Sequence, residues 1–124
     1  MKMEKRRIYK TSILKQKLSL LQDIFEEVVK GQDWWAVVGF IQISNELKRI
    51  NSLPTKVKAF KSSDTYKRRL SKSVTEFKRM VSDSKEDLKK YGAYYKGHYV
   101  DPDWVKAREK DLHVLEKEAK RLKL

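Results

Sequence analysis

Apolar residues recur at alternating intervals of three and four along most of this chain. That spacing places them on one face of an α-helix, whereas a half-buried β-strand would alternate apolar and polar residues. No alternating pattern of that kind occurs, and 124 residues is a common length for one domain. We therefore predict an all-α fold, in which residues 1–124 form a single small helical bundle of four main helices.

Capping residues indicate where these helices begin and end. Asp33, Asp101 and one of Ser62, Ser63 and Asp64 can each accept, through a side-chain oxygen, a hydrogen bond from the free N–H groups of a first helical turn. Lys30 followed by Gly31 is typical of a helix end. Together with the apolar spacing, these residues predict a short helical turn over 56–61 and longer helices over 11–30, 34–51, 64–91 and 102–122.

The third of the long helices has two interpretations. As a continuous helix of about 28 residues it would be about 42 Å long, which is long for a domain of this size. The spacing of Asp83, Ser84 and Glu86 also resembles a capping box, which would start a new helix. The third helix is therefore predicted to be either long or broken near residue 83.

The second and last helices differ in the surface that they must bury. Residues 34–45 carry no charge, so we expect the second helix to lie at the centre of the fold or of an oligomer. The last helix has a narrow, coiled-coil-like apolar stripe, which Arg108 interrupts. Such a stripe packs on one neighbouring helix or on a second copy of the chain. We predict a homo-oligomer, with a dimer favoured, and place Leu112 and Leu115 at its interface.

Basic residues are concentrated in one part of the chain. Residues 54–81 contain nine lysines and arginines against two acidic residues, and so carry +7 of the formal net charge of +13. At helical spacing Arg68, Lys72 and Arg79 share one stripe, whose neighbouring positions lie about 5–6 Å apart and suit a phosphate backbone. The alternative is a set of solvated helix faces without a ligand. The candidate nucleic-acid-binding residues here are Lys56, Lys58, Lys61, Lys67, Arg68, Arg69, Lys72, Lys78 and Arg79.

The N-terminal segment is a second candidate for contact with nucleic acid. Residues 1–10 form a basic arm that contains Lys5, Arg6 and Arg7. Basic arms of this kind lie along phosphates or enter a minor groove. The alternative is a frayed terminus without a binding role.

An aromatic loop precedes the last helix. Residues 92–101 include Tyr94, Tyr95 and Tyr99, with lysines nearby. Rings beside cations can stack on the bases of single strands. The alternatives are a protein interface, or rings that fold back and close the end of the bundle.

The sequence lacks the common patterns of catalysis and of cofactor binding. It has no cysteine, only the two histidines His98 and His113, and four isolated glycines. These counts exclude thiolate chemistry, glycine-rich phosphate loops and most histidine-based metal sites. We predict no catalytic residue, no cofactor and no metal site, and therefore a protein that is not an enzyme.

The functional interpretation is a nucleic-acid-binding accessory protein that contacts duplex DNA, in preference to RNA, through its backbone phosphates. The alternative is an assembly or adaptor protein whose basic surface meets an acidic protein partner. A third interpretation, attachment of the first helix to a membrane surface, is opposed by Asp23, Glu26 and Glu27 on its polar face.

Two further features bear on location. No apolar run reaches the roughly 18–20 residues that a membrane span needs, so no integral membrane association is expected. The basic N-terminus also lacks the apolar stretch of a signal peptide, and we expect a cytoplasmic protein. Small size, many lysines and the lack of enzyme motifs are typical of proteins encoded by viruses and other mobile elements.

Overall fold

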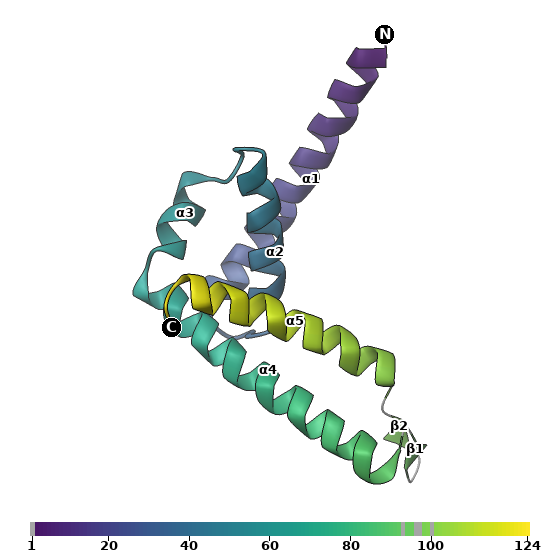
Figure 1. The fold of residues 1–124 in the computed structure, drawn as a ribbon. Helices are drawn as coiled ribbons and strands as arrows, with labels where there is room; N and C mark the ends of the chain where they lie inside the picture. The colour runs from purple at the N-terminus through teal and green to yellow at the C-terminus, as the bar shows by residue number, and fades with distance from the viewer. Residues whose placement is uncertain (1, 93, 96–97, 100) are drawn as a thin grey trace.

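The computed structural model describes residues 2–92, 94–95, 98–99 and 101–124, and the side chains of residues 12–92 and 101–124. Within these residues the chain forms five helices and one antiparallel hairpin of two-residue strands (Figure 1). The predicted all-α class is confirmed, with one helix more than the four expected, because the short turn over 56–61 is a helix. In chain order the elements are α1 (Lys2–Lys30), α2 (Ala36–Arg49), α3 (Thr55–Lys61), α4 (Asp64–Tyr91), β1 (Tyr94–Tyr95), β2 (His98–Tyr99) and α5 (Pro102–Arg121).

Two of the three predicted caps are formed as the sequence indicates. The third is not, because α2 begins at Ala36 rather than at residue 34 and has no side-chain cap, and Asp33 accepts a hydrogen bond from the N–H of Trp35 just before it. The Oγ atom of Ser63 accepts a hydrogen bond from the N–H of Tyr66 at 3.2 Å, at the start of α4. The Oδ1 atom of Asp101 accepts one from the N–H of Asp103 at 2.9 Å, at the start of α5. Each of these caps satisfies an N–H group that the first turn of a helix leaves without a backbone partner.

Helices α1 and α2 form the first of two helical hairpins (Figure 1). They run antiparallel, and Lys17 of α1 forms an ion pair with Glu46 of α2 at 2.7 Å. α1 begins at Lys2 rather than at residue 11, so the backbone of the basic N-terminal segment belongs to this helix. The sequence pattern missed this extension because the apolar stripe of α1 begins only near residue 13.

Helices α4 and α5 form the second hairpin. They run antiparallel, since Tyr66 contacts Glu118 at one end of the pair and Lys85 contacts Glu109 toward the other. α4 continues through residue 83 without interruption, so the capping-box pattern there does not begin a new helix.

The narrow apolar stripe of α5 is covered within the chain. Leu115 is fully buried, and Leu112 packs against the same core. The stripe therefore has its partner in α4 and α2 of the same molecule. Of the two leucines that the sequence suggested for a dimer interface, Leu115 is fully used in the fold and Leu112 is partly buried against the same core. A role of either residue in an oligomer stays a prediction.

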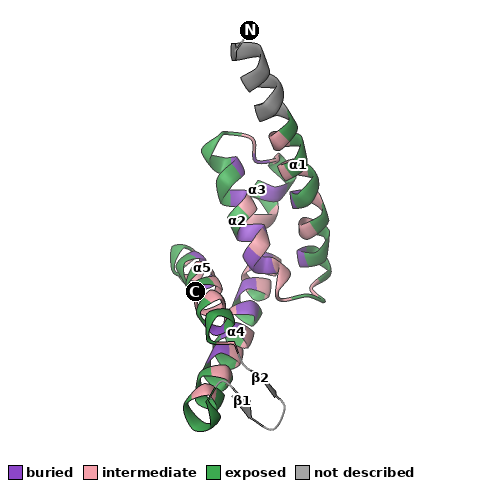
Figure 2. Cartoon of the chain, turned by 90° about the vertical axis from the view of Figure 1, so that its right-hand side faces the viewer, coloured by how far each residue is buried: buried purple, intermediate pink, exposed green. Residues whose placement is uncertain are grey.

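The hydrophobic core lies between the two hairpins and also includes residues of α3 (Figure 2). Phe40 of α2 has no exposed surface. Its ring contacts Phe25 of α1, Phe60 of α3 and Tyr66 of α4, at centroid distances of 6.1, 6.0 and 5.6 Å. One side chain of α2 thus touches three other helices, which agrees with the central place that its uncharged sequence predicts.

The cation that interrupts the α5 stripe lies against two neighbouring indole rings. The Cζ atom of Arg108 lies 5.2 Å from the ring centroid of Trp35 and 5.4 Å from that of Trp104. Its Nε atom also lies 3.0 Å from a carboxylate oxygen of Asp111. Attraction to the rings and a nearby negative charge together allow a guanidinium at this position. Arg108 therefore joins α5 to the segment before α2.

The turn after α1 depends on a close approach. Gly31 has a φ of +73°, and a β-carbon at this position would lie 2.3 Å from the Cζ atom of Arg69. Arg69 reaches this place from α4 to donate hydrogen bonds to the carbonyl oxygens of Val28 (3.2 Å) and Val29 (3.1 Å). Arg69 thus satisfies carbonyl groups that the end of α1 leaves free.

The Gly31→Ala substitution is expected to lower the free energy of unfolding by about 2 kcal/mol, about half of it from the left-handed backbone and the rest from displacement of Arg69. Gly92→Ala is the matched control, because Gly92 has a φ of +76° and no described atom within 4 Å of its β-carbon position. That control is expected to lose about 1 kcal/mol. Urea denaturation followed by circular dichroism measures both, and equal losses would contradict the capping role of Arg69.

Candidate nucleic-acid interface

The basic residues predicted from residues 54–81 do not form one surface. Arg68, Lys72 and Arg79 are exposed along α4 and are called the α4 stripe below. Arg79 forms an ion pair with Glu76 one turn away on the same helix. Lys78 lies on a different side of α4, in a groove of about 760 Å³ shared with α5. Lys78 is exposed as well, so what distinguishes the α4 stripe is that its three cations share one exposed face of the helix.

Three other members of the predicted set have contacts within the fold. Arg69 caps α1, as described above. Lys61 is largely buried and its Nζ atom lies 3.4 Å from Glu118. The Nζ atom of Lys56 lies over the ring of Phe25, 5.8 Å from its centroid. Helical spacing already separates these residues from the stripe, but it could not reveal their contacts, because the partners lie on other helices.

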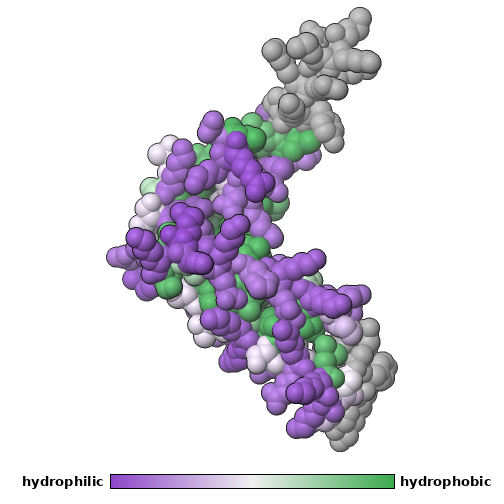
Figure 3. Space-filling model, in the orientation of Figure 1, coloured by the Kyte–Doolittle hydropathy of each residue, from purple (hydrophilic) through white to green (hydrophobic). Residues whose placement is uncertain are grey.

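The remaining two residues, Lys58 and Lys67, line a cavity together with four more cations. This cavity has a volume of about 510 Å³ and lies where the end of α2, α3, the start of α4 and the end of α5 meet. Most of the visible surface over α3, the start of α4 and the end of α5 is hydrophilic (Figure 3). We call the cavity the basic pocket, and its cations are Lys48, Lys58, Lys61, Lys67, Arg121 and Lys123.

A buried carboxylate lies beside the basic pocket. Glu118 is 4% exposed, and its Oε2 atom accepts a hydrogen bond from the Tyr66 hydroxyl at 2.6 Å. Its Oε1 atom accepts one from Nε of Arg121, also at 2.6 Å. Burial alone would raise the pKa of Glu118, but the hydrogen bonds from Arg121 and Tyr66 and the charge of Lys61 hold it below its usual range. Glu118 is therefore an anion that fixes three side chains around it.

The same network also shifts the pKa values of Tyr66 and Lys61. Burial and the hydrogen bond to Glu118 raise the pKa of Tyr66 well above its usual range, so that its hydroxyl remains a neutral donor. Burial is the largest effect on Lys61 and lowers its pKa, and the charges of Arg121 and Lys48 act in the same direction against the attraction of Glu118. The basic pocket is thus an electropositive place in which cations repel one another.

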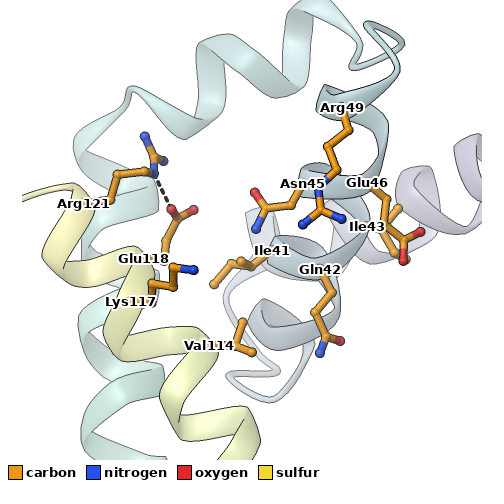
Figure 4. Close-up of a pocket in the computed structure, with 10 residues that line it drawn as sticks. All are labelled: Ile41, Gln42, Ile43, Asn45, Glu46, Arg49, Val114, Lys117, Glu118 and Arg121. Carbon is orange, nitrogen blue, oxygen red and sulfur yellow. Dashed lines mark hydrogen bonds and ion pairs between the residues drawn. The ribbon is translucent and has the colours of Figure 1, made fainter.

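A second cavity, of about 720 Å³, opens between α2 and α5 (Figure 4). In this view Ile41 and Asn45 of α2 point toward Val114, Lys117 and Glu118 of α5. The lining combines apolar, amide and oppositely charged groups. The lining of this second cavity therefore holds charges of both signs, whereas the charged residues that line the basic pocket are all cations.

The predicted contacts of the N-terminal arm and of the aromatic loop lie outside the side chains that the structure describes. Their backbones belong to α1 and to the β1–β2 hairpin. The roles of these residues in binding stay predictions. The residues concerned are Lys5, Arg6, Arg7, Tyr94, Tyr95 and Tyr99.

Within the part of the chain that the structure describes, no group of three His, Asp or Glu side chains is placed to hold a metal ion. None of the helices described is both long enough and apolar enough to cross a membrane. Comparison with known proteins finds no matching family model, and neither a curated protein nor a solved structure matches the chain. The functional argument therefore depends on the geometry and charge described above.

Proposed function

We propose that this protein binds nucleic acid, and duplex DNA in particular, through contacts with backbone phosphates. The observation that carries the proposal is the α4 stripe, which presents three exposed cations along one uninterrupted helix. The rise from Arg68 to Arg79 is about 16 Å. A duplex carries about ten phosphates in that length. A straight helix can present all three cations to one stretch of duplex at the same time.

The chemistry of the stripe supports the same proposal. A guanidinium group donates paired hydrogen bonds that match the oxygens of a phosphate, and an ammonium group adds a compact positive charge. Neither Lys72 nor Arg68 has an ion-pair partner among the described side chains, and Arg68 donates a hydrogen bond to the hydroxyl of Thr65 (3.3 Å). Neither residue has to give up a carboxylate to reach a phosphate. Contacts of this kind bind without reading the base sequence.

A variant in which Arg68, Lys72 and Arg79 are all replaced by glutamine tests the proposal. It is expected to bind duplex DNA at least about tenfold more weakly, and the slope of log affinity against log salt is expected to fall by about 3, because three phosphate contacts are lost. Fluorescence anisotropy with a labelled duplex between about 50 and 300 mM salt measures both quantities.

The matched control replaces Lys15, Lys106 and Lys110, which are exposed on α1 and α5, by glutamine. It removes the same charge and is expected to weaken binding by less than about threefold. Equal losses in the two variants would assign binding to net charge rather than to the α4 stripe. The wild-type chain failing to bind duplex DNA at low salt would overturn the proposal, and a preference for single strands would favour the tyrosines of residues 92–101 instead.

The second candidate function is an adaptor whose basic surface meets an acidic protein. It is favoured by exposed apolar side chains, since Leu20, Val29 and Ile50 are 51%, 42% and 55% exposed. Protein partners bury side chains of this kind, whereas a phosphate backbone leaves them in water. For this function we expect no duplex binding at any salt concentration, together with binding of the wild-type chain, but not of the stripe variant, to an acidic protein.

A further inference from the structure

We infer that the basic pocket is a binding site for a small molecule with two or three linked phosphate groups, and that it is separate from the α4 stripe. The pocket gathers six cations around about 510 Å³. Lys48 comes from α2, Lys58 from α3, Lys67 from α4, and Arg121 from α5. A ligand at this point would contact every helix except α1.

The charges around the pocket are not balanced by the chain itself. Glu118 pairs with Lys61 and Arg121. Like charges around one small space repel one another, and the surrounding protein weakens the screening that water provides. Entry of an anion is therefore favourable. The four cations without an acidic partner among the described side chains are Lys48, Lys58, Lys67 and Lys123.

The pocket is built into the fold and is more than a group of solvated lysines. The side chain of Lys61 is only 10% exposed, and Glu118 holds its ammonium group in place. Glu118 also holds the guanidinium of Arg121 with a hydrogen bond of 2.6 Å. Two of the six cations are thus placed before a ligand arrives, which reduces the entropy lost on binding. Burial first, and then the charges of Arg121 and Lys48, lower the pKa of Lys61, and a bound anion would oppose these effects.

Size and charge together select the class of ligand. Sites for small molecules usually have volumes of about 300–1,000 Å³, and a cavity in this range cannot enclose a nucleic-acid duplex. One phosphate group carries a charge of about −1.5 to −2 at neutral pH, which offsets at most half of the four unpaired cations. Two or three linked phosphates offset most of them. Nucleoside triphosphates and inorganic polyphosphates share this chemistry.

Isothermal titration calorimetry of the full chain tests the inference with three probes at about 150 mM salt, namely inorganic tripolyphosphate, adenosine triphosphate and inorganic phosphate. Tripolyphosphate is expected to bind at least about tenfold more tightly than inorganic phosphate. Adenosine triphosphate binding as tightly as tripolyphosphate, or more tightly, would indicate a nucleotide as the source of the phosphates. Weaker binding of adenosine triphosphate than of tripolyphosphate would indicate inorganic polyphosphate as the source. Wild-type protein that binds neither triphosphate would overturn the inference.

Paired variants separate this site from the proposed DNA surface. Lys48, Lys58 and Lys123 are exposed, so their joint replacement by glutamine leaves the core intact. This variant is expected to bind tripolyphosphate at least about tenfold more weakly and duplex DNA within about threefold of wild type. The stripe variant, which loses the same charge, is expected to show the reverse pattern. Equal loss of tripolyphosphate binding in both variants would overturn the inference, and circular dichroism checks that both are folded.

Discussion

Replacement of Phe40 by alanine is expected to lower the free energy of unfolding by about 4 kcal/mol. The ring is fully buried and lies within 6.1 Å, between centroids, of rings from α1, α3 and α4. Its removal loses apolar burial and leaves a cavity where α1, α2, α3 and α4 contact one another. Since a domain is usually stable by only about 5–15 kcal/mol, this single change is expected to remove a large share of the total.

Urea denaturation followed by far-ultraviolet circular dichroism measures this loss, and the melting temperature is expected to fall by about 15 °C. Leu20→Ala is the control, because Leu20 is a large apolar residue of α1 that is 51% exposed. It is expected to change stability by less than about 1 kcal/mol. A loss below about 1 kcal/mol for Phe40→Ala would mean that the four helices do not meet around this ring.

The helices could be predicted because their signals are local. The caps at Ser63 and Asp101 involve N–H groups two or three residues away, and the apolar period of α4 depends only on its own residues. The continuity of α4 through residue 83 could not be predicted in this way. There the local capping pattern competes with packing against α5, where Lys85 contacts Glu109, and the sequence does not state which is stronger.

The same distinction between local signals and contacts far apart in the chain applies to the candidate site. The α4 stripe could be predicted, since helical spacing alone decides which residues share a face. The separate role of Arg69 could not, because its acceptor at Val28 lies 41 residues away in the chain. The basic pocket was missed for the same reason. Lys48 and Arg121 approach Lys61 only after α2 and α5 have packed beside α3 and α4.

Glu118 did leave a signal in the sequence. It lies on α5 between Leu115 and Leu122, at the three- and four-residue spacing that defines the buried face. An acidic residue at such a position must find donors in the fold or lose its charge. The donors are Tyr66 of α4 and Arg121 of α5 itself. Acidic residues that occupy an apolar register are therefore a useful guide to buried networks in chains of this kind.

Replacement of Glu118 by alanine is expected to lower the free energy of unfolding by about 3 kcal/mol. The change leaves the buried hydroxyl of Tyr66 without its acceptor and the largely buried Lys61 without its counter-charge. Glu116→Ala is the matched control, because Glu116 lies on the same turn of α5 and is exposed. It is expected to alter stability by less than about 0.5 kcal/mol. Similar losses in the two variants, measured by urea denaturation, would contradict the network.

The acid dependence of stability gives a second test of the network, in which glutamine replaces Glu118 and keeps its shape. Burial alone would raise the pKa of Glu118, but Arg121, Tyr66 and Lys61 together hold it below its usual range in the folded chain. The unfolded chain therefore takes up a proton first as the pH falls, so the contribution of the carboxylate is complete above about pH 4.3 and is lost through the lower, folded pKa. The difference in unfolding free energy between wild type and Glu118→Gln is expected to be constant near neutral pH and to shrink below about pH 4. A difference that stays constant in acid would show that the charge of Glu118 does not stabilise the fold.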